Sequence, residues 1–150
     1  MGPNDEIAEL TCNIDDMTGE ALGYAFRALL DEGAYDVYTT AIDMKKDRPG
    51  TMLSVICPEK KADHFAALML KYTSSFGVRK TLHQRYIMDR IIEEVETPLG
   101  KVRLKTGKGF GVTKSKLEYD DLAELSKKHN MPLNEIERQI WTYLNSKSVK

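Results

Sequence analysis

The sequence predicts an α+β protein: a ferredoxin-like β-α-β-β-α-β unit followed by a β-hairpin and two C-terminal helices. Three observations predict this class: strand-like alternation opens the chain, helical spacing recurs between β-branched runs, and glycine or proline separates the elements. The 150 residues, 41% of them hydrophobic, can bury a sizeable core. We divide the chain into a polar tail (1–6), a ferredoxin-like domain (7–90) and a hairpin with helices (91–150) that packs as one unit with it.

The first three elements follow from periodicity and capping residues. Apolar and polar residues alternate over residues 8–14, which indicates a half-buried strand. Thr18 is suited to cap a helix that continues to about residue 32, and Gly33 is suited to end it. The β-branched and aromatic run at 34–42 predicts the second strand.

The second half of the ferredoxin-like unit shows the same order of signals. Residues 45–50 have turn chemistry and lead to a short apolar strand at 51–57. Pro58 is suited to open a helix with apolar residues at i, i+3, i+4 and i+7, and Gly77 ends it. A fourth strand at 78–87 completes the unit.

The remainder of the chain predicts an appendage. Strand-like stretches at 91–97 and 101–106 flank a Pro-Leu-Gly turn, which indicates a hairpin. A glycine-rich connector at 107–111 leads to two amphipathic helices, at about 119–129 and 133–146. Because an amphipathic helix must bury its apolar face, we expect these helices to pack on a sheet or on another subunit.

Composition and charge limit the function classes. No apolar stretch approaches the roughly 20 residues that span a bilayer, and no signal-peptide pattern is present, so we expect no membrane partner. Two cysteines are too few for a disulfide scaffold; we expect buried thiols in a cytoplasmic protein. The formal net charge is −1, yet residues 1–36 carry −8 and residues 37–116 carry +8. These blocks are either solvated faces or a cation site beside a phosphate site.

Two adjacent carboxylates, Asp15 and Asp16, lie between a predicted strand and a predicted helix. Neighbouring carboxylates repel each other, and a divalent cation or the positive end of a helix dipole offsets that repulsion. Both explanations remain open from the residues alone: a metal site, or acidic residues that favour a helix start.

Basic residues are concentrated in the turn that Pro49 and Gly50 close. Lys45, Lys46 and Arg48 could hold phosphate groups at fixed separation, since arginine can bind such oxygens in a bidentate manner. Lysines at a hairpin tip are also common as a solvated turn, so both interpretations stand.

Two further pairs of polar residues are weaker candidates. Arg79 and Arg85 share one face of the fourth predicted strand, where they could be functional or could instead protect the sheet edge or pair with nearby glutamates. Lys116 and Tyr119 lie beside carboxylates at the start of the third predicted helix, and this group could bind a base, a ribose or a metal-bound phosphate. Acidic residues at that position also favour the helix start by themselves.

The glycine-rich stretch does not indicate a nucleic-acid partner. Residues 108–111 match the start of the RNP1 motif, but no aromatic residue continues the match and the stretch follows the fourth strand instead of lying on the third. It also lacks the spacing of a dinucleotide fingerprint. The three histidines show no metal-ligand spacing.

Several segments together resemble a known family. Residues 13–20, NIDDMTGE, resemble a segment of the nickel insertase that completes the nickel-pincer nucleotide cofactor of lactate racemase. Residues 44–50, MKKDRPG, are similar to a second family segment. The resemblance covers the family's C-terminal domain, whereas its histidine-rich, nickel-supplying N-terminal part has no counterpart here. Three shorter stretches resemble further family segments: 76–79, 96–102 and 116–121.

The resemblance implies a CTP-binding domain of a CTP-dependent nickel chelatase of the lyase class. Such an enzyme inserts nickel into pyridinium bisthiocarboxylate mononucleotide and cleaves CTP to CMP and pyrophosphate. It implies that Asp15 and Asp16 hold Mg²⁺ or Mn²⁺ together with CTP. Expected partners are that mononucleotide, the N-terminal nickel-binding domain and further copies of this chain. The implied nucleotide-binding residues are Lys45, Lys46, Arg48, Arg79, Arg85, Lys116 and Tyr119.

Two functions of other classes remain open at this point. The chain could sense a nucleotide without catalysis and bias a partner domain. It could also be an oligomerisation module, to which a ferredoxin-like sheet and amphipathic terminal helices are suited.

Overall fold

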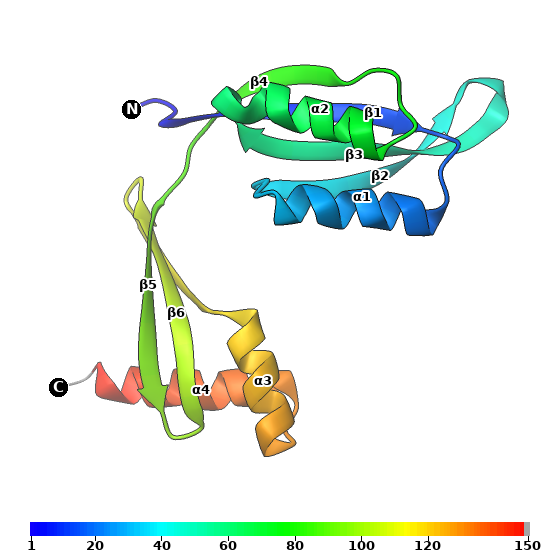
Figure 1. The fold of residues 1–150 in the computed structure, drawn as a ribbon. Coiled ribbons are helices and arrows are strands. Elements are labelled where there is room, and N and C mark those ends of the chain that lie inside the picture. The colour runs from blue at the N-terminus through cyan, green and yellow to red at the C-terminus, as the bar shows by residue number, and fades with distance from the viewer. Residues whose placement is uncertain (149–150) are drawn as a thin grey trace. The chain divides into compact units, whose positions relative to one another are not determined.

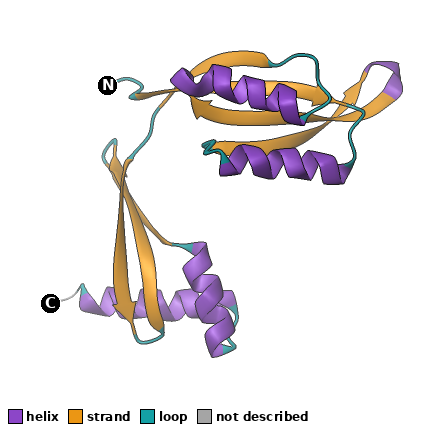
Figure 2. Ribbon diagram, viewed as in Figure 1, coloured by secondary structure: helices purple, strands orange, loops and turns teal. Residues whose placement is uncertain are grey.

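The computed structural model describes residues 1–148, and the chain divides into two compact units, Met1–Tyr86 and Ile87–Lys150 (Figures 1 and 2). We call them the N-terminal unit and the C-terminal unit. Two strands cross the boundaries expected from the sequence. Strand β1 (Asp5–Ile14) begins inside the expected tail, and strand β5 (Asp89–Thr97) begins before residue 91.

The N-terminal unit has the predicted β-α-β-β-α-β order and a four-stranded sheet. Every pair of neighbouring strands is antiparallel, and the strand order is β2-β3-β1-β4, so the ferredoxin-like prediction is confirmed. The elements after β1 are α1 (Gly19–Asp31), β2 (Asp36–Met44), β3 (Arg48–Pro58), α2 (Ala62–Tyr72) and β4 (Arg79–Arg85).

The core of the N-terminal unit lies between the sheet and its two helices. Alternate residues of β1, from Ala8 to Ile14, point to this side and are buried, as the period of two predicts. Phe65 from α2 and Leu29 from α1 are completely buried against them. Burying a side chain of this size stabilises the fold by roughly 1.5–3 kcal/mol.

Helix α2 starts later than the sequence predicts. Pro58 is the last residue of β3, where it pairs with Ile7 of β1, and a short 3₁₀ turn, η2 (Glu59–Lys61), precedes the helix. Proline is tolerated at this strand end because the ladder does not continue beyond it.

The C-terminal unit contains a three-stranded antiparallel sheet, β5-β6-β7, and two helices. Val102 of β6 and Leu117 of β7 pack with the buried faces of the helices, including Ile136 and Ile140. The two helices therefore bury their apolar faces within this unit. The elements after β5 are β6 (Gly100–Gly109), β7 (Val112–Leu117), α3 (Tyr119–His129) and α4 (Leu133–Lys147).

Strand β7 is the main departure from the sequence prediction, which placed a hairpin and a connector here. Phe110 and Gly111 form a two-residue turn with φ of 54° and 73°, and a tight hairpin needs such positive values. The strand that follows has five exposed residues before the buried Leu117, so it shows no apolar alternation that periodicity could detect.

Candidate functional site

The acidic pair lies in the loop that joins β1 to α1. Asp15 and Asp16 follow the last residue of β1, and Thr18 caps α1 by accepting a hydrogen bond from the Ala21 N–H at 3.1 Å. The predicted N-cap is therefore confirmed. Because the cap holds the start of the helix, both carboxylates are kept at the carboxyl end of β1.

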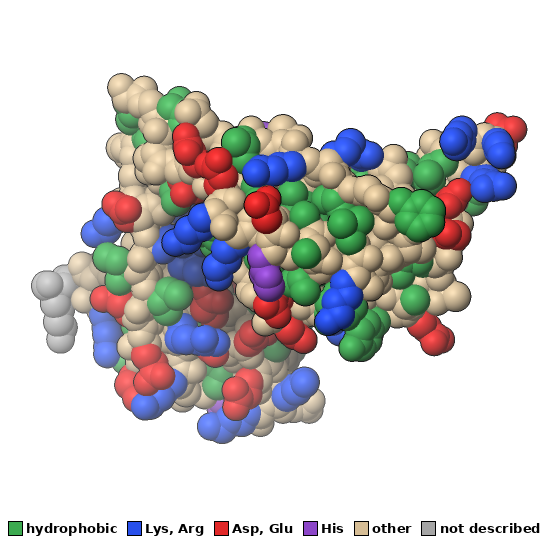
Figure 3. All heavy atoms as spheres, turned by 45° about the horizontal axis from the view of Figure 1, so that its top comes forward, with side chains coloured by type: hydrophobic (Ala, Val, Ile, Leu, Met, Phe, Trp, Pro, Cys, Tyr) green, Lys and Arg blue, Asp and Glu red, His purple; other side chains and the backbone are tan. Residues whose placement is uncertain are grey.

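The basic turn lies at the same end of the sheet. It forms the tip of the β2–β3 hairpin, which we call the hairpin tip (residues 45–48). Arg48 Nη1 lies 3.5 Å from Asp15 Oδ2, so the acidic pair and the hairpin tip converge. Within the described residues, 1–148, neither Lys45 nor Lys46 makes an ion pair. Figure 3 shows Lys and Arg side chains gathered over this tip.

Glycine permits the close approach of the hairpin tip to β1. A Cβ atom on Gly50 would lie 2.9 Å from the backbone oxygen of Ile14 and 2.5 Å from the sulfur of Met44. The tip itself includes η1 (Lys45–Asp47), in which Lys46 and Asp47 have φ of 64° and 56°. Left-handed backbone of this kind is unfavourable for residues with a side chain.

The loop between α2 and β4 completes this end of the unit. The Ser74 hydroxyl donates a hydrogen bond to Asp16, and the Ser74 N–H approaches the sulfur of Met17 at 3.4 Å. Arg79 Nη2 donates to Asn13 Oδ1 at 3.0 Å, because Arg79 faces Thr11 in the β1–β4 ladder. Three segments that are distant in the sequence thus meet around the acidic pair.

Cys12 lies beneath that same loop. Burial raises the pKa of its thiol, while hydrogen bonds to Thr73 and Ser75 and the charge of Arg79 act in the opposite direction. Cys57 is also buried and its thiol pKa is also raised by burial. Both cysteines are free thiols in the core, as the sequence predicts.

The acidic pair suits a cation that is shared with a ligand. Among residues 1–148, no group of three or more His, Cys, Asp or Glu side chains is arranged to enclose a metal ion. Two carboxylates beside cationic side chains fit Mg²⁺ or Mn²⁺ bound with phosphate oxygens, because such ions are commonly held by one or two carboxylates and a substrate phosphate. The donor set therefore fits a metal ion that is also bound by phosphate oxygens, and within residues 1–148 it does not form an all-protein cage.

Arg85 lies apart from the other predicted phosphate ligands. It pairs with Asp5 at the opposite end of the β1–β4 ladder, and its guanidinium carbon lies 5.3 Å from the centre of the Tyr35 ring. Six residues of strand separate it from Arg79, which corresponds to about 20 Å. The structure does not bring Arg85 to the acidic pair.

Lys116 and Tyr119 belong to the C-terminal unit. Lys116 is exposed on β7, opposite Lys105, and Tyr119 is the exposed first residue of α3. The acidic pair and the hairpin tip, by contrast, belong to the N-terminal unit.

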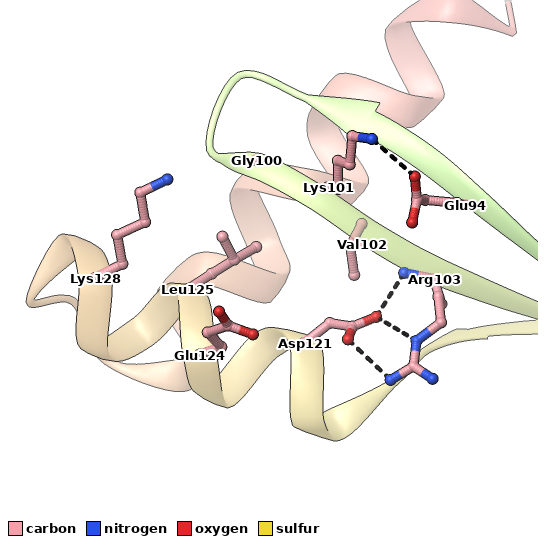
Figure 4. Close-up of a pocket in the computed structure, with 9 residues that line it drawn as sticks. All are labelled: Glu94, Gly100, Lys101, Val102, Arg103, Asp121, Glu124, Leu125 and Lys128. Carbon is pink, nitrogen blue, oxygen red and sulfur yellow. Dashed lines mark hydrogen bonds and ion pairs between the residues drawn. The ribbon is translucent and has the colours of Figure 1, made fainter.

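The C-terminal unit has a polar hollow of about 280 Å³ between β6 and α3 (Figure 4). Asp121 accepts hydrogen bonds from the Arg103 backbone N–H at 2.7 Å and from both Nε and Nη2 of its guanidinium at 2.9 Å. These bonds hold the pKa of Asp121 below its usual value. Lys101 lies 3.1 Å from Glu94 across the same hollow. Its charged groups therefore largely neutralise one another.

The comparison with protein families decides what kind of protein this is. The family model described as "Nickel insertion protein" matches residues 2–137. The chain belongs to the nickel insertion protein family. The resemblance of the NIDDMTGE and MKKDRPG segments is thereby confirmed.

Curated members of the nickel insertion family are longer than this chain. A putative nickel insertion protein of Maridesulfovibrio salexigens is 44% identical over 132 residues, which are 87% of this chain and 32% of the relative. The pyridinium-3,5-bisthiocarboxylic acid mononucleotide nickel insertion protein of Acetivibrio thermocellus is 37% identical over 133 residues, 89% of this chain and 33% of the relative. The chain thus spans about a third of the length of these relatives.

One solved structure is similar to this chain over nearly its whole length. It is LarC2, the C-terminal domain of a cyclometallase involved in the synthesis of the NPN cofactor of lactate racemase, in its apo form. The TM-score is 0.89 at 38% identity, and the match covers 94% of this chain and 98% of that chain. The fold and the assignment to a C-terminal domain are confirmed. No helix within residues 1–148 is both long and apolar enough to cross a membrane.

Two residues of the site in this nickel insertion family member were not predicted as site residues. Asn13 holds Arg79 and belongs to the NIDDMTGE segment, so the motif itself contained a signal for it. Ser74 holds Asp16 from a loop that is distant in the sequence and matches no motif. Only the packing of α2 against β1 brings that serine to the acidic pair.

Proposed function

We propose that this chain is the CTP-binding domain of a nickel insertion protein that places nickel into pyridinium-3,5-bisthiocarboxylic acid mononucleotide and cleaves CTP to CMP and pyrophosphate. The observation that supports the proposal most is the 3.5 Å approach of Arg48 to Asp15. It joins an acidic loop and a basic hairpin tip at one end of a sheet. Nickel enters this scheme as the inserted substrate, and the N-terminal nickel-binding domain is the proposed partner.

The cationic side chains would bind the triphosphate. Lys45 and Lys46 have no ion pair among the described residues, so phosphate oxygens need not displace a carboxylate from them. Arg48 would exchange Asp15 for phosphate, and that exchange would release the carboxylate for a cation. Arg79, fixed by Asn13, would contact the phosphates from the β4 side.

Asp15 and Asp16 would hold Mg²⁺ or Mn²⁺ beside the phosphates. When bound, the ion supplies positive charge that neutralises the triphosphate and polarises its oxygens. The products CMP and pyrophosphate require the bond between the α-phosphorus and the bridging oxygen to break, while an oxygen that comes from water takes its place on the α-phosphorus; pyrophosphate leaves with the bridging oxygen. The lysines at the hairpin tip would stabilise the negative charge that develops on the departing pyrophosphate.

Of the remaining predicted nucleotide ligands, two are kept in this proposal and one is left out. Lys116 and Tyr119 are exposed on the C-terminal unit, where they remain proposed contacts to the ribose or base. Arg85 we leave out of the phosphate group, because its partner Asp5 and its place on β4 assign it to the other end of the sheet.

Calorimetric titration with CTP and Mg²⁺ tests the proposal. The double variant Lys45→Glu/Lys46→Glu should lower CTP affinity at least about 30-fold, because two charge-assisted contacts become repulsive. The matched control is Lys60→Glu/Lys61→Glu, which makes the same charge change in η2. Because η2 follows the far end of β3, this control should retain wild-type affinity.

Two outcomes would contradict the proposal. Equal loss of affinity in both double variants would mean that only the net charge of the chain matters. A wild-type chain that does not bind CTP would reject the CTP-binding function itself. Repeating the titration in EDTA tests the metal: unchanged CTP affinity without Mg²⁺ or Mn²⁺ would remove Asp15 and Asp16 from a metal-binding role.

A further inference from the structure

Phe76 is a fully exposed aromatic side chain on the loop between α2 and β4. The loop around it is held by local hydrogen bonds. The Thr73 hydroxyl donates to the Met69 carbonyl at 2.7 Å, and the Ser75 hydroxyl donates to the Gly77 carbonyl at 2.7 Å. Because the Phe76 ring is fully exposed, it does not stabilise the loop by packing against the described residues of the chain. A ring of this size would gain free energy if a ligand or a partner buried it.

The loop fixes Phe76 beside the candidate site. Two residues before it, the Ser74 hydroxyl donates to Asp16; three residues after it, Arg79 donates to Asn13. Consecutive Cα atoms are 3.8 Å apart, so the Cα atom of Phe76 lies within about 8 Å of that of Ser74. An apolar ring is thus tied to the same end of the sheet as the acidic pair and the hairpin tip.

A polyanion-binding site beside an exposed ring matches the chemistry of a nucleotide. Cationic side chains can hold the phosphates, and a phenylalanine ring can stack on a base. An inorganic polyphosphate would use only the cations. The combination therefore favours a ligand with a planar aromatic group over phosphate alone.

We propose that Phe76 stacks on the base of the nucleotide whose phosphates bind at the hairpin tip. The proposal rests on the nucleotide-binding function proposed above. It adds a side chain that would make the site bind nucleotides more tightly than inorganic polyphosphate. Every base presents a π-face, so the ring adds affinity without choosing cytosine. Discrimination among the four bases then depends on polar contacts elsewhere.

The test compares CTP with inorganic tripolyphosphate, each titrated calorimetrically in the presence of Mg²⁺. Phe76→Ala should weaken CTP binding about 5- to 100-fold, the range found when a ring that stacks on a base is removed, and should leave tripolyphosphate affinity unchanged. Phe76→Tyr, which keeps a ring, should retain CTP affinity. Ile92→Ala, which removes another exposed apolar side chain, is the matched control and should change neither affinity.

Other results overturn the stacking proposal in distinguishable ways. If wild-type chain binds CTP and Phe76→Ala binds it equally well, the nucleotide site stands and Phe76 has no part in it. Equal weakening of both ligands would mean that the ring supports the loop instead of the base. A shift in oligomeric state on size-exclusion chromatography, with CTP affinity intact, would assign Phe76 to a contact between copies. If wild type binds neither ligand, the proposed function fails first.

Discussion

The basic side chains of strand β6 and those of the hairpin tip differ in whether they have carboxylate partners. Along β6 of the C-terminal unit, Lys101, Arg103 and Lys105 each pair with a carboxylate, at 3.1, 2.9 and 2.8 Å. At the hairpin tip of the N-terminal unit, two lysines make no ion pair within residues 1–148 and Arg48 lies 3.5 Å from Asp15. Basic residues are common in both units, so composition alone does not distinguish them.

The difference teaches which charges are available to a ligand. A cation that already has a short, well-aligned carboxylate partner would have to break that pair to bind phosphate. A lysine held at a loop tip without such a partner loses only hydration. The contrast therefore favours the hairpin tip over the basic row of β6 as a place for phosphate to bind. Three substitutions test it: one in the core of the N-terminal unit, one at Gly50 beside the hairpin tip, and one at Asp121, the partner of Arg103 on β6.

The largest effect is expected from the core of the N-terminal unit. Phe65→Ala should lower the free energy of unfolding by about 3–5 kcal/mol, because a fully buried ring leaves a cavity. Hydrogen exchange of the β1 and β3 amides measures it. Phe76→Ala is the control of the same residue type, and because Phe76 is exposed it should leave stability unchanged. Similar losses in both variants would contradict the assignment of Phe65 to the core.

A smaller effect is expected where the hairpin tip meets β1. Gly50→Ala should cost about 1–3 kcal/mol, because the added methyl group would displace the Ile14 backbone oxygen, which lies 2.9 Å from the Cβ position. The same change should weaken CTP binding by moving the tip away from the acidic pair. Gly19→Ala is the control, since a Cβ there meets nothing within 4 Å. Denaturant unfolding and calorimetry should separate the two variants; equal stability would mean that Met44 and β1 adjust without strain.

The smallest effect is expected in the C-terminal unit and depends on pH. Arg103 holds the pKa of Asp121 below its unfolded value, so the carboxylate stabilises the fold above that unfolded value and loses this contribution as pH falls through the folded pKa. Asp121→Asn should lower Tm by about 2–4 °C at pH 7, and the difference from wild type should shrink below about pH 4.

The neighbouring carboxylate provides the control for the size of that effect. Asp120 lies in the same first turn of α3, but the hydrogen bonds of Arg103 go to Asp121, so Asp120→Asn should lower Tm less than Asp121→Asn does. Neither variant should alter CTP affinity if phosphate binds in the N-terminal unit. A loss of CTP affinity in Asp121→Asn would break the contrast between the units.

Most of the fold could be predicted because each signal was local. The alternation of apolar and polar residues predicted β1, and the capping residue Thr18 predicted the start of α1. The helical spacing of apolar residues predicted the buried face of α2. Strand β7 was missed because five of its six side chains are exposed and its pairing depends on a two-residue turn at Phe110 and Gly111. Strand β7 is stabilised mainly by its pairing with β6, and a pattern within its own six residues does not reveal that pairing.

The candidate site was only partly predictable, for a related reason. Asp15 and Arg48 lie in motifs, and the antiparallel pairing of β1 with β3 brings the end of β1 to the start of β3. Arg79 and Arg85 carry the same charge at opposite ends of β4, and the ladder register shows that Arg79 is the one at the carboxyl end of β1. Ser74 reaches Asp16 across 58 positions of sequence, a contact that no spacing rule contains.

The left-handed backbone at Lys46 bears on both the stability of the hairpin tip and the charge that it presents. Glycine adopts such a conformation without penalty, whereas a side chain there costs roughly 1–2 kcal/mol. Replacing Lys46 by glycine would relax the turn and remove a cation with the same change. If Lys46 binds phosphate as proposed, stability of the turn and affinity for the ligand favour different residues at this position, glycine for the first and lysine for the second.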